Sequence, residues 1–347
     1  MAAIDASDLR LTYADGTEAV RGVDLTVPEG EFFGFLGPNG AGKTTTIKTF
    51  ATLLSPTGGT VTVNGFDAAS EARKVRESIG YMAQETSVDL ELTARENVRF
   101  AAEAYGVPRS ERRDRIDELL SLVDLADVAD KEASEFSGGM KKRLDVATAL
   151  VHDPPLVFLD EPTTGLDPKA RNRLWDYFER INDEGTTLFL TTQYLEEADQ
   201  LCDRISVILD GEIVATGSPT ELKRRVGGEI LDVEIDVDDG DGATGAGADE
   251  RERAATLAEE SDIFDDDAAI AVTDDGISVT AERAREHGPD LLVAFRDEGV
   301  TVTGFNIRAP TMDDVFLAIT GERVDADEGE GADATAGTAA EPEVRAE

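Results

Sequence analysis

A glycine-rich segment between an apolar run and a helical pattern carries the most specific chemistry in the sequence. Residues 37–45 read GPNGAGKTT and follow FFGFL at 32–36, so the pattern GxxxxGK[ST] stands in the context that it requires. The backbone N–H groups of such a loop surround phosphate oxygens, and the N-terminus of the next helix adds its dipole. Lys43 would reach the β- and γ-phosphates, and Thr44 could ligate Mg²⁺. The predicted phosphate-binding residues are Gly37, Pro38, Asn39, Gly40, Ala41, Gly42, Lys43, Thr44 and Thr45.

The apolar run LVFLD at 156–160 ends in a carboxylate, Asp160, and a second carboxylate, Glu161, comes directly after it. Asp160 ends this run, and a carboxylate at the end of a buried strand needs a partner such as Mg²⁺ with its waters. Glu161 could orient and deprotonate the water that attacks a γ-phosphate. On its own, the pair would suit a strand that ends in solvated acids equally well. The phosphate loop favours the interpretation of Asp160 as a metal ligand and of Glu161 as a general base.

A third segment, FSGGMKKR at 136–143, places a serine and two glycines at the start of a helical pattern. Ser137, Gly138 and Gly139 could form a second phosphate cradle, because a helix N-terminus offers free N–H groups and a positive dipole end. Plain N-capping by Ser137 is the alternative. The segment resembles the signature motif of ATP-binding cassette (ABC) proteins, which implies ATP as the ligand and favours the cradle. We expect the basic run 141–143 to be an exposed helix face.

Further elements of the ABC family stand in the family's order between residues 3 and 226. Tyr13 resembles the aromatic residue that stacks on adenine. Gln84 in GYMAQE resembles the glutamine of the Q-loop, which implies a catalytic role and a place beside the metal. Asp167 in GLD resembles the D-loop and implies a position at the ATP site. Taken singly, Tyr13 would suit strand packing and Gln84 a solvated strand end, so the resemblance depends on the whole set and its order.

One residue departs from the family pattern. Where ABC proteins usually have a histidine that contacts the γ-phosphate, this sequence has Gln193 in LTTQYLEEA. An amide can donate a hydrogen bond to phosphate, but it cannot become a cation as an imidazole can. The resemblance gives Gln193 a catalytic role at the γ-phosphate.

Gln193, together with DQLCDRI and the closing APTMDDVFLAITG, resembles the ATP-binding subunits of daunorubicin/doxorubicin-resistance exporters. This resemblance implies ATP hydrolysis that powers export of a drug-like or lipophilic substrate. It also implies a separate ABC-2-type membrane permease as partner and a location at the cytoplasmic face of the membrane. The single phosphate loop and single signature cradle predict a homodimer, because the family places the two motifs on opposite edges of the domain.

Two other functions stay open on the sequence. A soluble ABC protein that acts on ribosomes or DNA would be expected to have a second cassette, a long coiled-coil insertion or a basic patch, and none of these occurs in the sequence. A slow-turnover, ATP-gated regulatory module is the other alternative, because Gln193 replaces the usual histidine.

The elements that would position these residues alternate between strands and helices, which indicates an α/β fold. Nearly continuous apolar runs at 32–36, 156–160 and 187–191 are typical of buried parallel strands. Two hairpins, which turn at residues 15–16 and 210–211, predict antiparallel strands. We therefore predict a P-loop NTPase domain of the ABC type with a parallel core sheet, an antiparallel β subdomain and a helical subdomain over residues 3–226. The predicted helices are 43–54, 93–105, 110–123, 138–152, 168–183 and 219–226.

A smaller α+β domain is predicted over residues 229–321. Its pattern runs strand, helix, strand, strand, helix, strand and a final helix, which suits a ferredoxin-like unit. The segment 238–250, DDGDGATGAGADE, is too polar and glycine-rich to order itself, and we expect a disordered insert there. The acidic segment 322–347 has the same character and predicts a disordered tail.

The charge balance excludes one class of partner. The chain of 347 residues has 74 acidic and 33 basic side chains, a net charge of -41, which disfavours binding to nucleic acid. Acidic residues are spread over the whole first part of the chain instead of forming one tail, and only 8 of the basic residues are lysine, which favours adaptation to a salty cytoplasm over a merely acidic protein with a disordered tail. A single cysteine suits a reducing compartment, and the first residues show no export signal.

Overall fold

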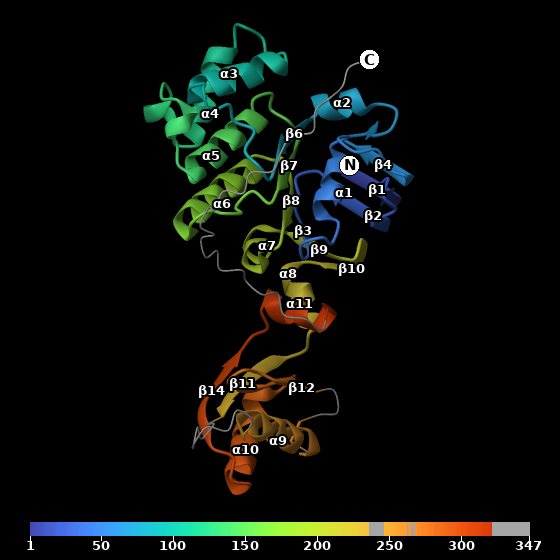
Figure 1. The fold of residues 1–347 in the computed structure, drawn as a ribbon, viewed down its shortest axis with the longest axis vertical. Helices are drawn as coiled ribbons and strands as arrows, with labels where there is room; N and C mark the ends of the chain where they lie inside the picture. Colours follow the sequence, from blue (N-terminus) through green and yellow to red (C-terminus); the bar gives the residue numbers. More distant parts are fainter. Residues whose placement is uncertain (236–245, 262, 265–267, 321–347) are drawn as a thin grey trace, which may run out of the picture.

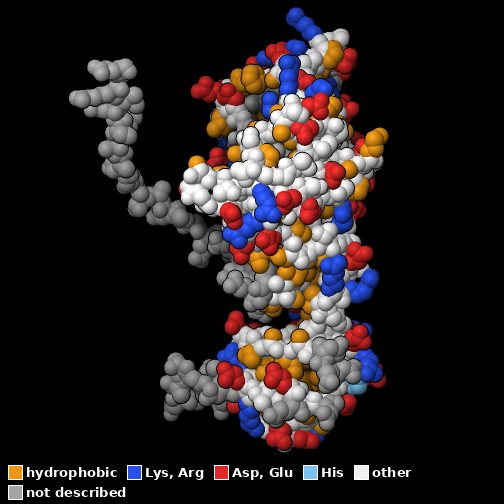
Figure 2. Space-filling model, turned by 90° about the vertical axis from the view of Figure 1, so that its right-hand side faces the viewer, with side chains coloured by type: hydrophobic (Ala, Val, Ile, Leu, Met, Phe, Trp, Pro, Cys, Tyr) orange, Lys and Arg blue, Asp and Glu red, His pale blue; other side chains and the backbone are white. Residues whose placement is uncertain are grey.

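The computed structural model describes residues 1–235, 246–261, 263–264 and 268–320. The chain forms an upper α/β domain and a lower α+β unit, joined through a narrow waist (Figure 1). Acidic side chains are scattered over the whole face that Figure 2 presents. None of the helices within the described ranges is long and apolar enough to cross a membrane.

The central sheet places the predicted site residues at the ends of its strands. It has the order β10-β9-β3-β8-β7-β6, and all neighbours are parallel except β10 and β9. Every residue of β3, β7 and β8 is buried, as expected for strands that are covered on both faces. These strands are β3 (Phe32–Leu36), β6 (Ile79–Met82), β7 (Leu156–Asp160), β8 (Thr187–Thr192), β9 (Arg204–Leu209) and β10 (Glu212–Gly217).

One face of this sheet is covered by α1 (Lys43–Phe50) and by a second, antiparallel sheet. The second sheet has the order β2-β1-β4-β5, and the predicted hairpin turns at Gly16, whose φ is 92°. Five phenylalanine rings fill the space between the layers, with centroids 5.5 to 6.3 Å apart: Phe33, Phe35, Phe50, Phe158 and Phe189. The strands are β1 (Ala2–Thr12), β2 (Glu18–Pro28), β4 (Gly58–Val63) and β5 (Phe66–Asp67).

Helices cover the opposite face (Figure 1). Four of them match the predicted helical patterns: α3 (Ala94–Ala104), α4 (Arg112–Leu122), α5 (Gly138–Ala149) and α6 (Pro168–Asp183). Two short helices, α2 (Ala72–Glu77) and α7 (Leu195–Leu201), were not predicted.

The expectation of an exposed basic face on α5 is wrong for two of its three residues. Lys142 and Arg143 are buried, and Arg143 Nη1 donates to the carbonyl of Val123 at 2.9 Å.

The lower unit has the predicted ferredoxin-like topology. Its sheet has the order β12-β13-β11-β14 with every pair antiparallel, and helices α9 and α10 pack on one face around a separate core. The disordered insert predicted over 238–250 is wrong at its end, because α9 begins at Ala246; residues 238–245 and the tail 322–347 lie outside the described residues. The elements are β11 (Glu229–Ile235), α9 (Ala246–Glu260), β12 (Ala269–Val272), β13 (Gly276–Ala281), α10 (Ala284–Asp297) and β14 (Val302–Arg308).

The last described helix, α11 (Met312–Thr320), packs on the upper domain although it follows the lower sheet. It contacts α8 (Pro219–Arg225) and α7, and its buried side chains Met312, Val315 and Phe316 belong to the same core as Leu222 and Leu195. The sequence prediction grouped this helix with the second domain. The structure instead uses α11 to tie the two parts of the chain together.

Candidate functional site

The phosphate loop runs from the end of β3 to the start of α1, as the motif predicts. Gly40 and Gly42 have φ values of 85° and 105°, a region that favours glycine. A Cβ on Gly37 would lie 2.3 Å from the carbonyl oxygen of Ile208, and a Cβ on Gly42 would lie 2.4 Å from that of Ala19. Gly37 and Gly42 therefore have no room for a side chain, and at Gly40 the backbone conformation is what favours glycine.

Lys43 lies at the bottom of this loop and is buried. Its Nζ donates to the carbonyl oxygens of Gly37 at 2.8 Å and Pro38 at 3.1 Å, and it lies 3.2 Å from Oε1 of Glu161. Burial lowers the pKa of Lys43, while the Glu161 carboxylate opposes that change. The Lys43 ammonium is thus held in a fixed position, and a bound phosphate would compete with Glu161 for it.

Thr44 and Asp160 meet at the side of the loop. Thr44 Oγ1 donates to Oδ1 of Asp160 at 3.1 Å, and Thr191 Oγ1 donates to the same oxygen at 2.7 Å. Asp160 is only 1% exposed, and Tyr81 lies 3.4 Å from its second oxygen. A hydroxyl beside one carboxylate suits Mg²⁺, which usually takes one or two carboxylates and completes its shell with phosphates and waters.

Glu161 takes a backbone conformation that is unusual for its type. Its φ is 46°, and its N–H donates to the carbonyl of Thr191 at 3.0 Å, which fixes the turn after β7. Oε1 faces Lys43, and Oε2 accepts a hydrogen bond of 3.0 Å from Nε2 of Gln84. The structure therefore brings the predicted base and the predicted Q-loop glutamine together, whereas it places the Gln84 amide on Glu161 rather than on Asp160.

Sequence reasoning missed the residues that hold Gln84 in place. The buried ammonium of Lys142 donates to the backbone oxygen of Gln84. Asp145, one helical turn further along α5, accepts hydrogen bonds from the hydroxyls of Thr86 and Ser87 at 2.5 and 2.7 Å. Burial lowers the pKa of Lys142 and raises that of Asp145. Lys142 and Asp145 are three residues apart and therefore lie on one face of the helix. This spacing is the feature of the sequence that could have indicated a shared role.

Ser137 and Asp167 lie apart from this cluster. Ser137 caps α5 by accepting from the N–H of Met140 at 3.3 Å, and Asp167 caps α6 by accepting from that of Ala170 at 2.9 Å. The two caps share a hollow of about 200 Å³ with Gly139, and Arg143, Lys169 and Arg173 also line it. Because α5 and α1 cover opposite faces of the sheet, this hollow is separate from the phosphate loop (Figure 1).

Two further predicted residues lie near the loop. The hydroxyl of Tyr13 is 2.9 Å from Oγ1 of Thr45, so its partly exposed ring stands beside the end of the motif. Gln193 follows β8 directly, and the N–H of Gly37 donates to the carbonyl of its neighbour Thr192 at 3.3 Å. Gln193 is thus at the same sheet edge as the phosphate loop.

Comparison with known proteins decides the family. Residues 20–164 match the family described as ABC transporter, and residues 217–320 match the family described as ATP-binding protein DrrA1-3-like, C-terminal domain. The chain is 41% identical over 323 residues to the daunorubicin/doxorubicin resistance ATP-binding protein DrrA of Streptomyces peucetius, covering 93% of this chain and 94% of that protein. The chain belongs to the ABC family of ATP-binding proteins.

Other relatives and solved structures agree with this assignment. The linearmycin resistance ATP-binding protein LnrL of Bacillus subtilis is 36% identical and covers 66% of this ABC protein and 73% of LnrL. The structure of cbiO1 from Clostridium perfringens, part of the ABC transporter complex cbiONQ, has a TM-score of 0.60 and 29% identity, with 65% of this chain and 94% of cbiO1 covered. A dimeric post-hydrolysis structure of MJ0796, bound to ADP and Pi, has a TM-score of 0.57 and 29% identity, with 62% and 98% covered.

These findings confirm the predicted fold class, family and ATPase activity. The α/β domain is an ABC nucleotide-binding domain that binds and hydrolyses ATP. The alternative of a soluble ABC protein that acts on ribosomes or DNA is not favoured, because the relatives are named as resistance and export proteins.

Proposed function

We propose that this ABC protein is the ATP-hydrolysing subunit of an exporter that moves a drug-like or lipophilic compound through a separate ABC-2-type permease. The observation that carries the proposal is the match to DrrA over 93% of the chain, which includes the C-terminal unit as well as the ATPase domain. A subunit of this kind would lie at the cytoplasmic face of the membrane, attached through the permease.

The roles of the site residues follow from their contacts. Lys43 would exchange its contact with Glu161 for the β- and γ-phosphates, and the loop N–H groups would bind the remaining phosphate oxygens. Thr44 and Asp160, with Gln84 beside them, would hold Mg²⁺, which would neutralise charge on the phosphates. Once Lys43 has turned to the phosphates, Glu161 would be free to accept a proton from the attacking water.

Gln84 and Gln193 would position the reacting groups. The Gln84 amide donates to Glu161, so it can hold the carboxylate in the orientation in which the base meets water. Gln193 stands beyond β8 at the edge that carries Gly37, and its amide would donate to the γ-phosphate. Tyr13, beside Thr45, would stack on the adenine ring.

The second phosphate cradle would act in a homodimer. Ser137, Gly138 and Gly139 start a helix on the face of the sheet opposite α1, so one chain does not bring them to its own phosphate loop. Two copies arranged head to tail would each supply this cradle, together with Asp167, to the ATP held by the other copy. Loss of the γ-phosphate would then weaken the dimer and give the motion that a permease uses.

The surface for the permease would lie on the helical subdomain. Phe100 and Tyr105 on α3 and at its end are 69% and 42% exposed, and Leu90, in the segment that follows Gln84, is 42% exposed. A cytoplasmic helix of the permease that packs on Leu90 would contact the segment that follows Gln84, the glutamine that contacts the base. Movement at the permease would thereby reach Glu161 through one segment of chain.

The proposal can be tested in the organism that makes this protein. Deletion of the gene should increase the cell content of at least one compound in a panel of lipophilic dyes and antibiotics. Wild-type protein should restore export, and Glu161→Gln should not, although it should be made at the same level. Complementation by Glu161→Gln would refute export driven by hydrolysis at this base. An unchanged content of every compound would argue against the exporter.

A further inference from the structure

Glu197 on α7 is a buried carboxylate that joins two other segments of the ATPase domain to this helix. Its exposure is 0%, and its Oε1 accepts a hydrogen bond of 2.9 Å from Oγ1 of Thr163 and one of 3.0 Å from Nε1 of Trp175. A carboxylate is costly to bury without such donors. Glu197 therefore fixes the positions of both donors relative to α7.

The three segments that meet at Glu197 each carry a residue of the proposed nucleotide site. Thr163 comes two residues after Glu161. The second donor lies on α6, the helix that Asp167 caps. Glu197 itself comes four residues after Gln193. One carboxylate oxygen thus connects the segments of the proposed base, of the D-loop aspartate and of the glutamine at the γ-phosphate position.

The hydrogen bond between Thr163 and Glu197 closes a circuit of contacts around Gln193. The circuit starts at Glu161, whose N–H donates to the carbonyl of Thr191 at 3.0 Å. From there the chain runs through Gln193 to Glu197. The hydrogen bond from Thr163 then returns to the segment that begins with Glu161. Gln193 thus stands between two fixed points, and release of one would let its turn move relative to Glu161.

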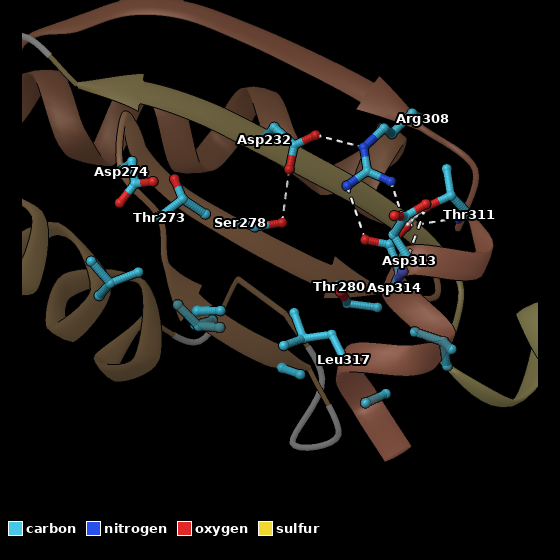
Figure 3. Close-up of a pocket in the computed structure, with 16 residues that line it drawn as sticks. Asp232, Thr273, Asp274, Ser278, Thr280, Arg308, Thr311, Asp313, Asp314 and Leu317 are labelled. Atoms are coloured by element: carbon cyan, nitrogen blue, oxygen red, sulfur yellow. Dashed lines mark hydrogen bonds and ion pairs between the residues drawn. The ribbon is translucent and has the colours of Figure 1, made fainter. Parts of the chain in front are cut away.

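The helix that carries Glu197 is itself held by its neighbours. It packs on β3, β8 and α11. Arg308 of β14 donates to Asp314 of α11 at 2.6 and 3.0 Å, which joins α11 to the lower sheet (Figure 3). With α7 held in this way, the hydrogen bond from Thr163 determines where the turn after Glu161 lies relative to Gln193.

Two buried polar atoms at this junction make no hydrogen bond within the described residues: Oε2 of Glu197 and Nε of Arg171. The Arg171 guanidinium lies 5.4 Å from the ring centroid of Trp175 and 5.8 Å from that of Tyr194, which follows Gln193 directly. Burial raises the pKa of Glu197, while its hydrogen bonds and Arg171 oppose that change. Unpaired buried polar atoms are uncommon and lower stability, which favours a role for this carboxylate besides packing.

We infer that Glu197 is a positioning residue for ATP hydrolysis, which holds Gln193 and the turn after Glu161 in one arrangement. The inference rests on the proposed function, because it takes Glu161 as the base and Gln193 as the donor to the γ-phosphate. The contact with Thr163 needs an acceptor at Oε1, and Oε1 accepts whether or not the carboxyl is ionised. Loss of the contact misplaces reacting groups, so it should affect kcat and not ATP affinity.

The test removes the contact from the side of Thr163. Thr163→Val keeps nearly the same shape without a hydroxyl. It should lower kcat about five- to tenfold and change the affinity for a non-hydrolysable ATP analogue by less than about twofold. Thr163→Ser and Glu197→Gln keep a donor and an acceptor, and each should retain at least about half of the wild-type kcat.

Thr187→Val is the matched control. Thr187 is also buried, and its hydroxyl accepts from the N–H of Gly30 at the end of β8 that lies away from Gln193. This variant loses a buried hydrogen bond too, so its Tm should fall while its kcat stays at the wild-type value. An equal loss of kcat in Thr187→Val and Thr163→Val would overturn the inference.

A double-mutant cycle with Gln193→Ala separates positioning from a general loss of packing. If the contact acts through Gln193, Thr163→Val should lower kcat by less than about twofold further in the Gln193→Ala background. If Thr163→Val does not fold, Glu197→Met takes its place in the cycle, because methionine fills a similar space without a carboxylate acceptor.

The outcomes distinguish this inference from the proposed function. A lowered kcat in Gln193→Ala together with wild-type kcat in Thr163→Val would overturn the inference and leave the role of Gln193 intact. Losses that multiply in the double variant would have the same meaning, because the two residues would then act independently. An unchanged kcat in Gln193→Ala would overturn the proposed role of Gln193 and the inference with it.

Discussion

The contact between Lys43 and Glu161 makes a quantitative prediction for Glu161→Gln. Both side chains are buried, at 4% and 6% exposure, and Nζ lies 3.2 Å from Oε1. Breaking a buried ion pair by removing one partner typically costs about 3–5 kcal/mol. The glutamine amide can still accept one hydrogen bond from Lys43 and contact Gln84, so we take the cost as about 2 kcal/mol. Without nucleotide, Tm should fall by about 4–8 °C, for a domain of this size.

The same reasoning predicts tighter nucleotide binding. In the wild type, Lys43 must leave Glu161 to reach the phosphates, so nucleotide binding breaks this ion pair. In Glu161→Gln the pair is already absent, and its cost of about 2 kcal/mol no longer opposes binding. This difference corresponds to a gain of roughly 30-fold in nucleotide affinity. Turnover should fall by a factor of about 10² to 10⁴, because the general base is lost. Stability should be measured without nucleotide and affinity with a non-hydrolysable ATP analogue, so that turnover does not enter, and single-turnover assays should give the chemical step.

Glu85→Gln is the control for the charge change, since Glu85 is exposed and next to Gln84. It should alter neither Tm nor affinity. An unchanged Tm and an unchanged analogue affinity in Glu161→Gln would refute the argument that Lys43 exchanges one partner for another. Wild-type turnover in Glu161→Gln would refute the assignment of the base itself, whatever the binding results.

Four further predictions concern the dimer, Gln193, a buried acid and salt. Lys43→Ala and Ser137→Arg chains should each be inactive, and mixing them should restore part of the ATPase activity; no recovery in proven mixed dimers would contradict a site shared between chains. Gln193→Ala should lower kcat more than ATP affinity, and an unchanged kcat would remove Gln193 from the reaction. Burial raises the pKa of Glu197 above its ordinary value of 4.5, so the folded protein should lose stability as pH rises from about 4.5 through the raised pKa. The side chain in Glu197→Gln does not titrate, so the difference in Tm between wild type and this variant should shrink as pH rises over the same range. A difference in Tm that stays constant from pH 5 to 8 would count against the raised pKa. Finally, Tm should rise with NaCl up to molar concentrations, because screening reduces repulsion within a chain of net charge -41, and a flat response would argue against adaptation to salt.

The sequence predicted most accurately the elements whose residue pattern indicates only one type of secondary structure. The runs at 32–36 and 156–160 are apolar except for the terminal Asp160, with Gly37 after the first and Pro155 before the second, and the structure has β3 and β7 at the same residues. The helix at 168–183 begins with Asp167-Pro168, a cap followed by a residue suited to the first turn, and α6 has the same bounds. In these segments the local signal and the tertiary environment agree.

The contacts around Gln84 show what the sequence did not reveal. The run Lys141-Lys142-Arg143 has the composition of a solvated helix face, yet Lys142 is buried. Its ammonium is stable there because it donates to the carbonyl of Gln84, a residue 58 positions earlier in the chain. Local pattern gives no information on such a partner, since the contact depends on how α5 packs against the end of β6.

The same limit applies to α11, with a consequence for how the two parts of the chain work together. Its apolar residues Met312, Val315 and Phe316 predict a buried helix face but not which domain buries it. In the structure they join the core of the ATPase domain, while Asp314 on the same helix binds Arg308 of the lower sheet. One helix therefore makes an apolar contact with one part and an ionic contact with the other. The lower unit and α7, the helix directly after Gln193, are consequently linked through a single rigid element of nine residues. Displacing α11 would cost both contacts, so an event at the lower unit that moves α11 would also change its packing on α7, the helix that follows Gln193.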